Sequence, residues 1–93
     1  MAVYVDEAWL RRGRRWAHLM ADTLDELHAM AARLDLPSRA FQRKVSGAHY
    51  DITEPLRERA IALGAVALSR RDDRQRLHDV IARARAQGRG EHD

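Results

Sequence analysis

The sequence predicts a small α/β domain, in which a mostly parallel sheet of three or four strands is packed by about three helices. Three short runs, at 2–5, 16–20 and 65–68, are rich in β-branched, aromatic or other apolar residues and have the composition of strands. Capping residues mark two clear helix starts, at Thr23 and Thr53. Strands that alternate with helices in this way favour an α/β fold.

The first two strands are expected to lie side by side. Only about ten residues separate 2–5 from 16–20, which is short for a helical crossover and favours an antiparallel pair. Alternation along the second run places Trp16, His18 and Met20 on one face of the sheet. We therefore expect the His18 imidazole to be partly covered by apolar neighbours.

Between these strands, Gly13 marks a turn that is crowded by arginines. The arginines are Arg11, Arg12, Arg14 and Arg15. A guanidinium group matches the geometry of phosphate and carboxylate, so this turn could hold an anion. A solvated loop is the competing interpretation.

The first helix has a capping box, in which the Thr23 hydroxyl accepts an amide and Glu26 reaches back to the Thr23 amide. Its buried stripe is predicted to be Leu24, Leu27, Ala31 and Leu34. His28 falls on the same side and is expected to face the core. A histidine in that position more often satisfies a structural hydrogen bond than a catalytic role.

A long connection over 35–53 follows, because Pro37 ends the first helix. We expect one or two helical turns over 38–44, with Phe41 packing inward, and then a loop. Long connections in compact domains are often functional. This one ends in His49-Tyr50-Asp51, which places an imidazole, a phenol and a carboxylate together.

The second helix is predicted to begin at Thr53 and to stop at Gly64, which suits a left-handed helix end. The apolar run 65–68 then reads as a strand buried on both faces, which completes a right-handed strand–helix–strand unit.

A last helix is expected to start at Asp72 or Asp73. Its apolar stripe comprises Leu77, Val80, Ile81 and Ala84. A chain of 93 residues has room for one core, so we expect one domain over 1–87 and a flexible tail over 88–93.

Ligands of open α/β sheets bind at the carboxyl ends of the strands, and polar residues of this chain are expected to gather there. The predicted catalytic residues are His49, Asp51 and Asp6, and the predicted substrate contacts are Arg14, Tyr50 and His28. The predicted metal ligands are Asp6, His18, Asp22, His49 and Asp51. Carboxylates with imidazoles suit Mg²⁺, Mn²⁺ or Zn²⁺, and they could equally provide a general base. Each residue also has a structural interpretation, such as a helix cap for Asp22.

Several motifs in order resemble a bacterial and phage family catalogued as domain of unknown function four-zero-three-one. The motifs are Val3-Tyr4-Val5-Asp6, Gly13-Arg14 with Trp16 and His18, Ala21-Asp22, Glu26-Leu27-His28, Phe41-Gln42, His49-Tyr50-Asp51 and Gly64-Ala65. The resemblance spans roughly residues 2–70. Where a glycine is expected after the first helix, this chain has Asp35-Leu36-Pro37. The resemblance implies a real polar site but names no chemistry.

Two functions remain open at this point. The first is a metal- or phosphate-binding domain with hydrolase-like activity on a nucleotide or nucleic-acid phosphoester. The second is a non-catalytic accessory or protein-interaction module whose polar cluster is structural. The sequence leaves homodimerisation open.

Composition narrows the compartment and the chemistry. The chain has no cysteine, which excludes a disulfide framework and a thiolate zinc site. No apolar run reaches membrane-spanning length, and we expect a soluble cytoplasmic protein with no membrane partner. The net charge is only +3 and is spread along the chain, so nucleic acid is weakly supported as a partner. No P-loop, dinucleotide fingerprint or nucleophile elbow is present.

Overall fold

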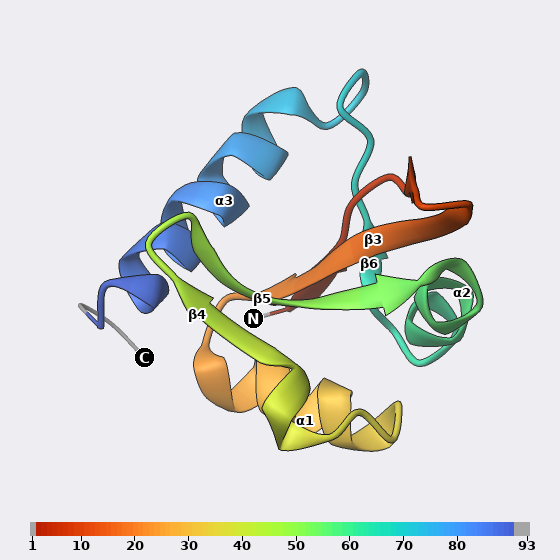
Figure 1. The fold of residues 1–93 in the computed structure, drawn as a ribbon. Helices are drawn as coiled ribbons and strands as arrows, with labels where there is room; N and C mark the ends of the chain where they lie inside the picture. Colours follow the sequence, from red (N-terminus) through yellow and green to blue (C-terminus); the bar gives the residue numbers. More distant parts are fainter. Residues whose placement is uncertain (1, 91–93) are drawn as a thin grey trace.

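Six strands pair into one mixed sheet in the computed structural model, which describes residues 2–90 (Figure 1). The strands are β1 (Val3–Val5), β2 (Trp9–Arg11), β3 (Arg14–Ala21), β4 (Phe41–Lys44), β5 (Gly47–Thr53) and β6 (Val66–Ala67). Three α-helices, α1 (Leu24–Arg33), α2 (Glu54–Ala62) and α3 (Arg74–Gly88), and a short 3₁₀ helix, Ser38–Ala40, complete the described part. The strand order is β4-β5-β3-β1-β6, and β2 pairs with the first half of β3.

The predicted α/β class is confirmed, but the predicted mostly parallel sheet of three or four strands is wrong. Only the β1–β6 pair is parallel, and the other four pairs are antiparallel. Two of the antiparallel pairs, β2–β3 and β4–β5, are joined by turns of two residues, and a turn this short can only join antiparallel strands. One of these hairpins turns at Arg12 and Gly13, which both have positive φ, +52° and +78°. The predicted antiparallel pairing of the first two strands, β1 with β3, is confirmed.

The predicted helical turns over 38–44 are largely wrong, because Phe41–Lys44 forms β4. This strand pairs with β5 across the turn at Val45 and Ser46. Phe41 lies opposite Tyr50 in this pair, and the two rings contact each other at 5.4 Å. The long connection is therefore mainly a β-hairpin that carries His49-Tyr50-Asp51 on its second strand.

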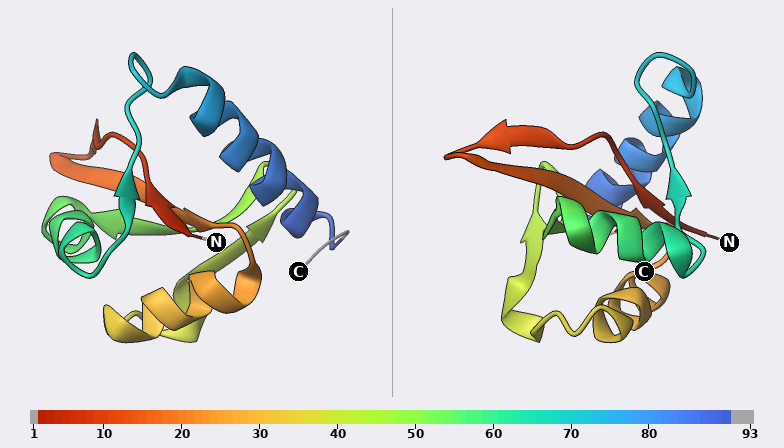
Figure 2. Two further views of the ribbon diagram at one scale, coloured as in Figure 1. Left: turned by 180° about the vertical axis from the view of Figure 1, so that it is seen from behind. Right: turned by 90° about the vertical axis from the view of Figure 1, so that its right-hand side faces the viewer.

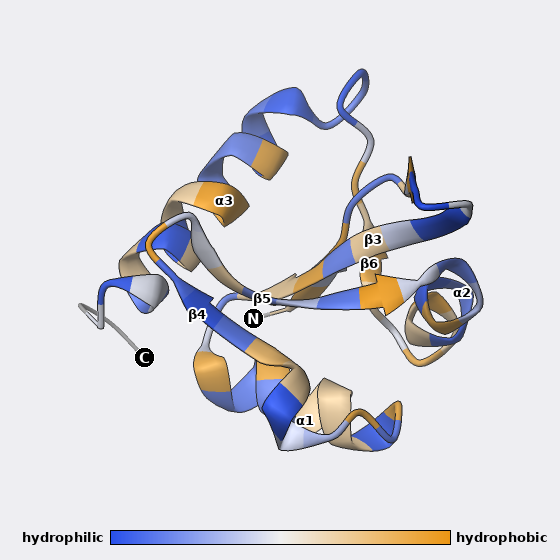
Figure 3. Cartoon of the chain, in the orientation of Figure 1, coloured by the Kyte–Doolittle hydropathy of each residue, from blue (hydrophilic) through white to orange (hydrophobic). Residues whose placement is uncertain are grey.

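The helices cover the two faces of the sheet unequally (Figures 1 and 2). α1 and α2 pack on one face, where the core includes Leu19, Leu27 and Ile52. α3 packs on the other face over a smaller cluster that includes Tyr4 and Met20. The hairpin of β2 and β3 projects from the domain, and its hydrophilic tip is clear in Figure 3.

The start of α1 is largely as predicted. The Thr23 hydroxyl oxygen accepts from the Glu26 amide, but the Glu26 carboxylate accepts from that hydroxyl and not from the Thr23 amide. The predicted stripe is buried, whereas His28 is exposed at its margin, contrary to the expectation that it faces the core. After the helix, Asp35 adopts φ +58°, the left-handed conformation for which a glycine was expected.

The C-terminal half follows the predicted order with two corrections. Thr53 occupies the N-cap position of α2, but its side chain makes no capping hydrogen bond, and Gly64 after the helix has φ +109°. β6 is an edge strand of two residues with Ala67 exposed, so it is not buried on both faces. α3 begins after Asp73 and includes Gly88, which the sequence assigned to the tail. Of the predicted tail, residues 91–93 lie outside the described residues.

No helix within residues 2–90 combines the length and apolar character needed to cross a membrane.

Gly88 tests how closely α3 docks on the β4–β5 hairpin. A Cβ at this position would overlap the Lys44 carbonyl oxygen. Gly88→Ala is expected to lower the free energy of unfolding by about 1–3 kcal/mol, as overpacking does. Helix propensity alone predicts a gain of up to about 1 kcal/mol. Urea unfolding measures the sign, and the exposed Ala82 of α3 provides the matched Ala82→Gly control. A more stable Gly88→Ala protein would contradict this close packing.

Candidate metal centre

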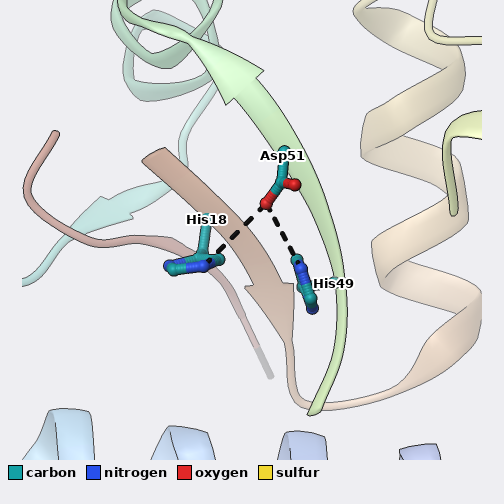
Figure 4. A group of neighbouring side chains, drawn as sticks. All are labelled: His18, His49 and Asp51. Carbon is teal, nitrogen blue, oxygen red and sulfur yellow. Dashed lines mark ion pairs between the residues drawn. The ribbon is translucent and has the colours of Figure 1, made fainter. Parts of the chain in front are cut away.

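His18, His49 and Asp51 converge on the sheet face that α3 partly covers (Figure 4). The antiparallel pairing of β3 with β5 sets His18 opposite Asp51. Because side chains alternate along a strand, His49 points to the same face as Asp51. One ligand atom from each residue lies within 4.8 Å of the others. Neighbouring strands therefore present two imidazoles and one carboxylate around a single point.

The side chains approach each other through their outer atoms. His49 Nε2 lies 3.3 Å from Asp51 Oδ1, and His18 Nε2 lies 3.9 Å from the same oxygen. The two imidazole rings meet edge to face, with centroids 5.0 Å apart. Asp51 Oδ1 is thus the common neighbour of both Nε2 atoms.

A second layer of hydrogen bonds orients each of these groups. Asp6 Oδ2 lies 2.7 Å from His18 Nδ1, and the Gly47 carbonyl lies 2.7 Å from His49 Nδ1. Both partners are acceptors, so each Nδ1 donates, and the Nε2 of each neutral ring carries the lone pair. Gln42 Nε2 donates to Asp51 Oδ2 at 2.8 Å, which leaves Oδ1 facing the two histidines.

Asp6 and Trp9 fix the position of the His18 ring. Asp6 is 8% exposed, and its Oδ1 accepts the His18 backbone amide at 2.7 Å. From α2, Arg57 Nε donates to the Asp6 backbone carbonyl at 2.7 Å. The Trp9 indole of β2 stacks on the imidazole at 4.4 Å. The ring is therefore held by a carboxylate on one nitrogen and by an aromatic surface on its face.

The surroundings of His18 shift its protonation. Burial lowers the pKa of His18, but the hydrogen bond to Asp6 and the negative charges of Asp6 and Asp51 raise it by more. Arg70 opposes these charges weakly. The net effect is a pKa above the ordinary value for histidine.

Two cavities flank the cluster. One of about 400 Å³ is lined by Arg11, Arg12, Arg14, Trp16 and Asp51. The other, of about 290 Å³, lies between the sheet and α3. His18 and His49 line this second cavity together with Asp6, and Arg70 and Arg85 contribute positive charge to it. The cluster stands between the two cavities.

The structure does not bring Asp22, a predicted metal ligand, to this cluster. Because β3 runs antiparallel to β1, the end of β3 lies beside the start of β1 and away from Asp6. There the Asp22 carboxylate accepts the Ala2 amide at 2.7 Å and the Tyr4 hydroxyl at 3.1 Å, and it pairs with Arg83 at 3.2 Å. Asp22 has a structural role at the opposite end of the strands.

Tyr50 and His28, predicted to contact substrate, lie on the other face of the sheet. Alternation along β5 turns Tyr50 into the core, where it is 2% exposed. Its hydroxyl bonds His28 Nδ1 at 2.8 Å, and Phe41 contacts the His28 ring. Burial raises the pKa of Tyr50, so its phenol stays neutral in the physiological range.

Arg14 does lie beside the cluster, in the cavity that Asp51 also lines, with its guanidinium 6.0 Å from the Trp16 ring. Three residues that support the cluster were not predicted as site residues, namely Gln42, Trp9 and Arg57. Gln42 was assigned to a helical turn, and its contact with Asp51 depends on the β4–β5 register, in which it lies opposite His49. The pairing of Trp9 with Trp16 likewise depends on the β2–β3 hairpin, whose arginine-rich sequence does not have the apolar pattern of a strand.

A model of the family described as protein of unknown function (DUF4031) matches residues 3–80. The chain belongs to this family. The match confirms the resemblance inferred from the motifs, and it includes every residue of the His18, His49 and Asp51 cluster. No curated protein and no solved structure matches the chain. The family's description names no activity, so the function has to be inferred from the geometry.

The raised pKa of His18 makes the metal-free protein sensitive to pH. Below pH 6.5, which is about the pKa of histidine in the unfolded chain, the charged His18 ring stabilises the fold fully. This stabilisation is lost as the pH rises through the higher pKa of His18 in the folded protein. NMR titration in chelator should show His18 titrating above the ordinary range. Asp6→Asn should lower the pKa of His18, because the hydrogen bond and the negative charge that raise it are lost while the burial that lowers it remains. A His18 that titrates below the ordinary range in the unmodified protein would contradict the assigned role of Asp6.

Proposed function

We propose that His18, His49 and Asp51 bind a divalent transition-metal ion, and that the protein is a metal-dependent hydrolase of phosphate esters. The observation that carries the proposal is the conflict between His49 and Asp51. His49 Nδ1 is engaged by the Gly47 carbonyl, so the lone pair of its Nε2 faces the Asp51 carboxylate across 3.3 Å. Two electron-rich atoms at this separation repel unless a cation, either a proton or a metal ion, lies between them.

The donor set favours a transition metal over Mg²⁺. Imidazole nitrogens suit Zn²⁺ and Fe²⁺, and a carboxylate adds Mn²⁺ to the candidates, whereas Mg²⁺ prefers oxygen ligands alone. Catalytic zinc sites commonly have three protein ligands and keep a position for water. The hydrogen bonds of Asp6 and Gln42 match the outer partners that orient metal-binding histidines and carboxylates. We therefore expect Zn²⁺ or Mn²⁺ to bind more tightly than Mg²⁺.

The ion would lower the pKa of a bound water and polarise a phosphoryl oxygen. In hydrolysis, the water oxygen joins phosphorus, the bond to the leaving alcohol breaks, and the water's proton passes to the leaving oxygen. Asp6 acts here as a positioning residue, because both of its carboxylate oxygens are engaged by His18. Arg14 in the adjoining cavity provides a guanidinium that suits the charge developing on a phosphoryl group.

A structural network is the alternative function of the same residues, and the double hydrogen bond between Asp6 and His18 favours it. On this view the cluster only ties β1, β3 and β5 together, and a divalent ion would have no effect. His49→Ala or Asp51→Asn would then lower stability by about 1 kcal/mol or more without changing any response to metal. The response to metal separates the two functions.

The proposal predicts binding of one Zn²⁺ or Mn²⁺ ion per chain by isothermal titration calorimetry. Binding should also raise the melting temperature, because the ion binds only the folded state. His18→Ala and His49→Ala should each abolish both effects. His78→Ala is the matched control, since His78 lies exposed on α3 with its side chain 78% accessible. Heat of binding that persists in both ligand variants would refute this metal site.

Gln42→Leu tests the outer hydrogen bond to Asp51. Loss of an outer partner commonly weakens metal affinity about 10- to 100-fold. We expect a loss in that range for Zn²⁺, measured by competition with a chelating dye, while the fold is retained because Gln42 is only partly buried. An unchanged affinity would show that Asp51 does not need this bond to hold the ion.

A further inference from the structure

The metal centre lies between two groups of arginines that make no ion pair within residues 2–90. Arg11, Arg12 and Arg14 line the first cavity, and Arg70 and Arg85 line the second. Three other arginines of the domain are paired with carboxylates. Arg15 pairs with Glu54, Arg57 with Glu58, and Arg83 with Asp22. Each cavity beside the proposed ion therefore has more arginines than carboxylates, with Asp51 the acidic residue of the first and Asp6 that of the second.

The first group lies on the β2–β3 hairpin, and its position follows from the tight turn at Arg12 and Gly13. Arg11 lies opposite Arg14 in the strand pair, so both side chains belong to one face of the hairpin. Like charges placed in this way destabilise a hairpin. The arrangement is relieved when an anion binds between them, and phosphate suits the guanidinium fork.

The same face carries two indoles. Trp9 lies opposite Trp16, and both are partly exposed. Arg14 already stacks over Trp16, and Trp9 stacks over His18. Partly exposed aromatic rings among arginines are the surface on which single-stranded nucleic acids stack their bases.

The second group flanks a partly open and partly apolar cavity between the sheet and α3. Met20, Leu77 and Ile81 form its apolar wall, and the histidines lie at its edge. At about 290 Å³ this cavity is close to the lower limit of small-molecule sites, so it has room for one compact group. With Arg70 and Arg85 beside it, a base could enter while its phosphate stays near the arginines.

We infer that the substrate is a single-stranded nucleic acid whose backbone crosses the metal centre, with one flanking phosphate on the hairpin arginines and another beside Arg70 and Arg85. The inference rests on the proposed function for the role of the ion. A mononucleotide would engage only one of the two arginine groups. The substrate is accordingly an internal phosphodiester, with nucleotides on both sides of the scissile bond.

Fluorescence anisotropy with a labelled ten-nucleotide strand, as DNA and as RNA, tests whether the protein binds single strands. The measurement is made in the presence of a chelator, so that no metal ion contributes to binding. Affinity should fall as salt rises, with a slope of about 0.7 per neutralised phosphate. Arg11→Gln and Arg70→Gln should each weaken binding and reduce that slope by about 0.7, because each removes one phosphate contact. The exposed Arg33 on α1 provides the matched control Arg33→Gln, which should leave affinity and slope unchanged.

Three results would overturn the inference. One is the absence of binding to either strand, and another is competition by a nucleoside monophosphate as effective as that of the unlabelled strand. The third is an effect confined to one of the two arginine variants, which would mean that the strand does not cross the centre. Metal titration without nucleic acid is a separate measurement, so a failure of the metal site and a failure of strand binding can be told apart.

Discussion

The register in which β3 pairs with β5 is the constraint on which the candidate site depends. It sets His18 opposite Asp51. His49 lies two residues before Asp51 on β5, so its side chain points to the same face of the sheet. A slip by one residue would turn Tyr50 toward that face and bury the carboxylate instead. The opposite face prevents such a slip, because Leu19 and Tyr50 lie opposite each other in the buried core beneath α1. The packing of one face thus fixes the chemistry of the other.

Hydrogen bonds from neighbouring residues, most of them outside this strand pair, give the cluster its preorganisation. Asp6 directly follows β1, Gln42 belongs to β4, and the Gly47 carbonyl comes from the start of β5. α2 joins this arrangement through Arg57, which holds the backbone of Asp6. Several elements of the domain therefore assemble the site. Because hydrogen bonds already hold the side chains of the cluster, these side chains lose little conformational freedom when a ligand binds.

The sequence singled out the residues of the His18, His49 and Asp51 cluster but did not predict the sheet around them. Alternation along 16–20 and the dense run at 49–51 were local signals for His18, His49 and Asp51. Helix starts were equally local, as at Thr23. Strand direction, in contrast, depends on which strand each segment pairs with, and β4, with the sequence Phe-Gln-Arg-Lys, has little apolar alternation to reveal it. The error in direction explains why Asp22 was grouped with Asp6, from which the antiparallel pairing separates it.

Charge illustrates the same limit. A net charge of +3 spread along the chain gave weak support for nucleic acid, yet folding gathers Arg11 and Arg14 on one side of the cluster and Arg70 on the other. Their common position depends on tertiary contacts between a hairpin, a loop and α3, which no local pattern encodes.

The most direct test of the central claim is a crystal structure of the protein loaded with Zn²⁺ or Mn²⁺, with the ion located by its anomalous scattering. We expect one ion bound by the Nε2 atoms of His18 and His49 and by a carboxylate oxygen of Asp51. We also expect the Nδ1 contacts to Asp6 and to the Gly47 carbonyl to be retained. An ion bound elsewhere, or a loaded crystal with no anomalous peak between these side chains, would contradict this claim.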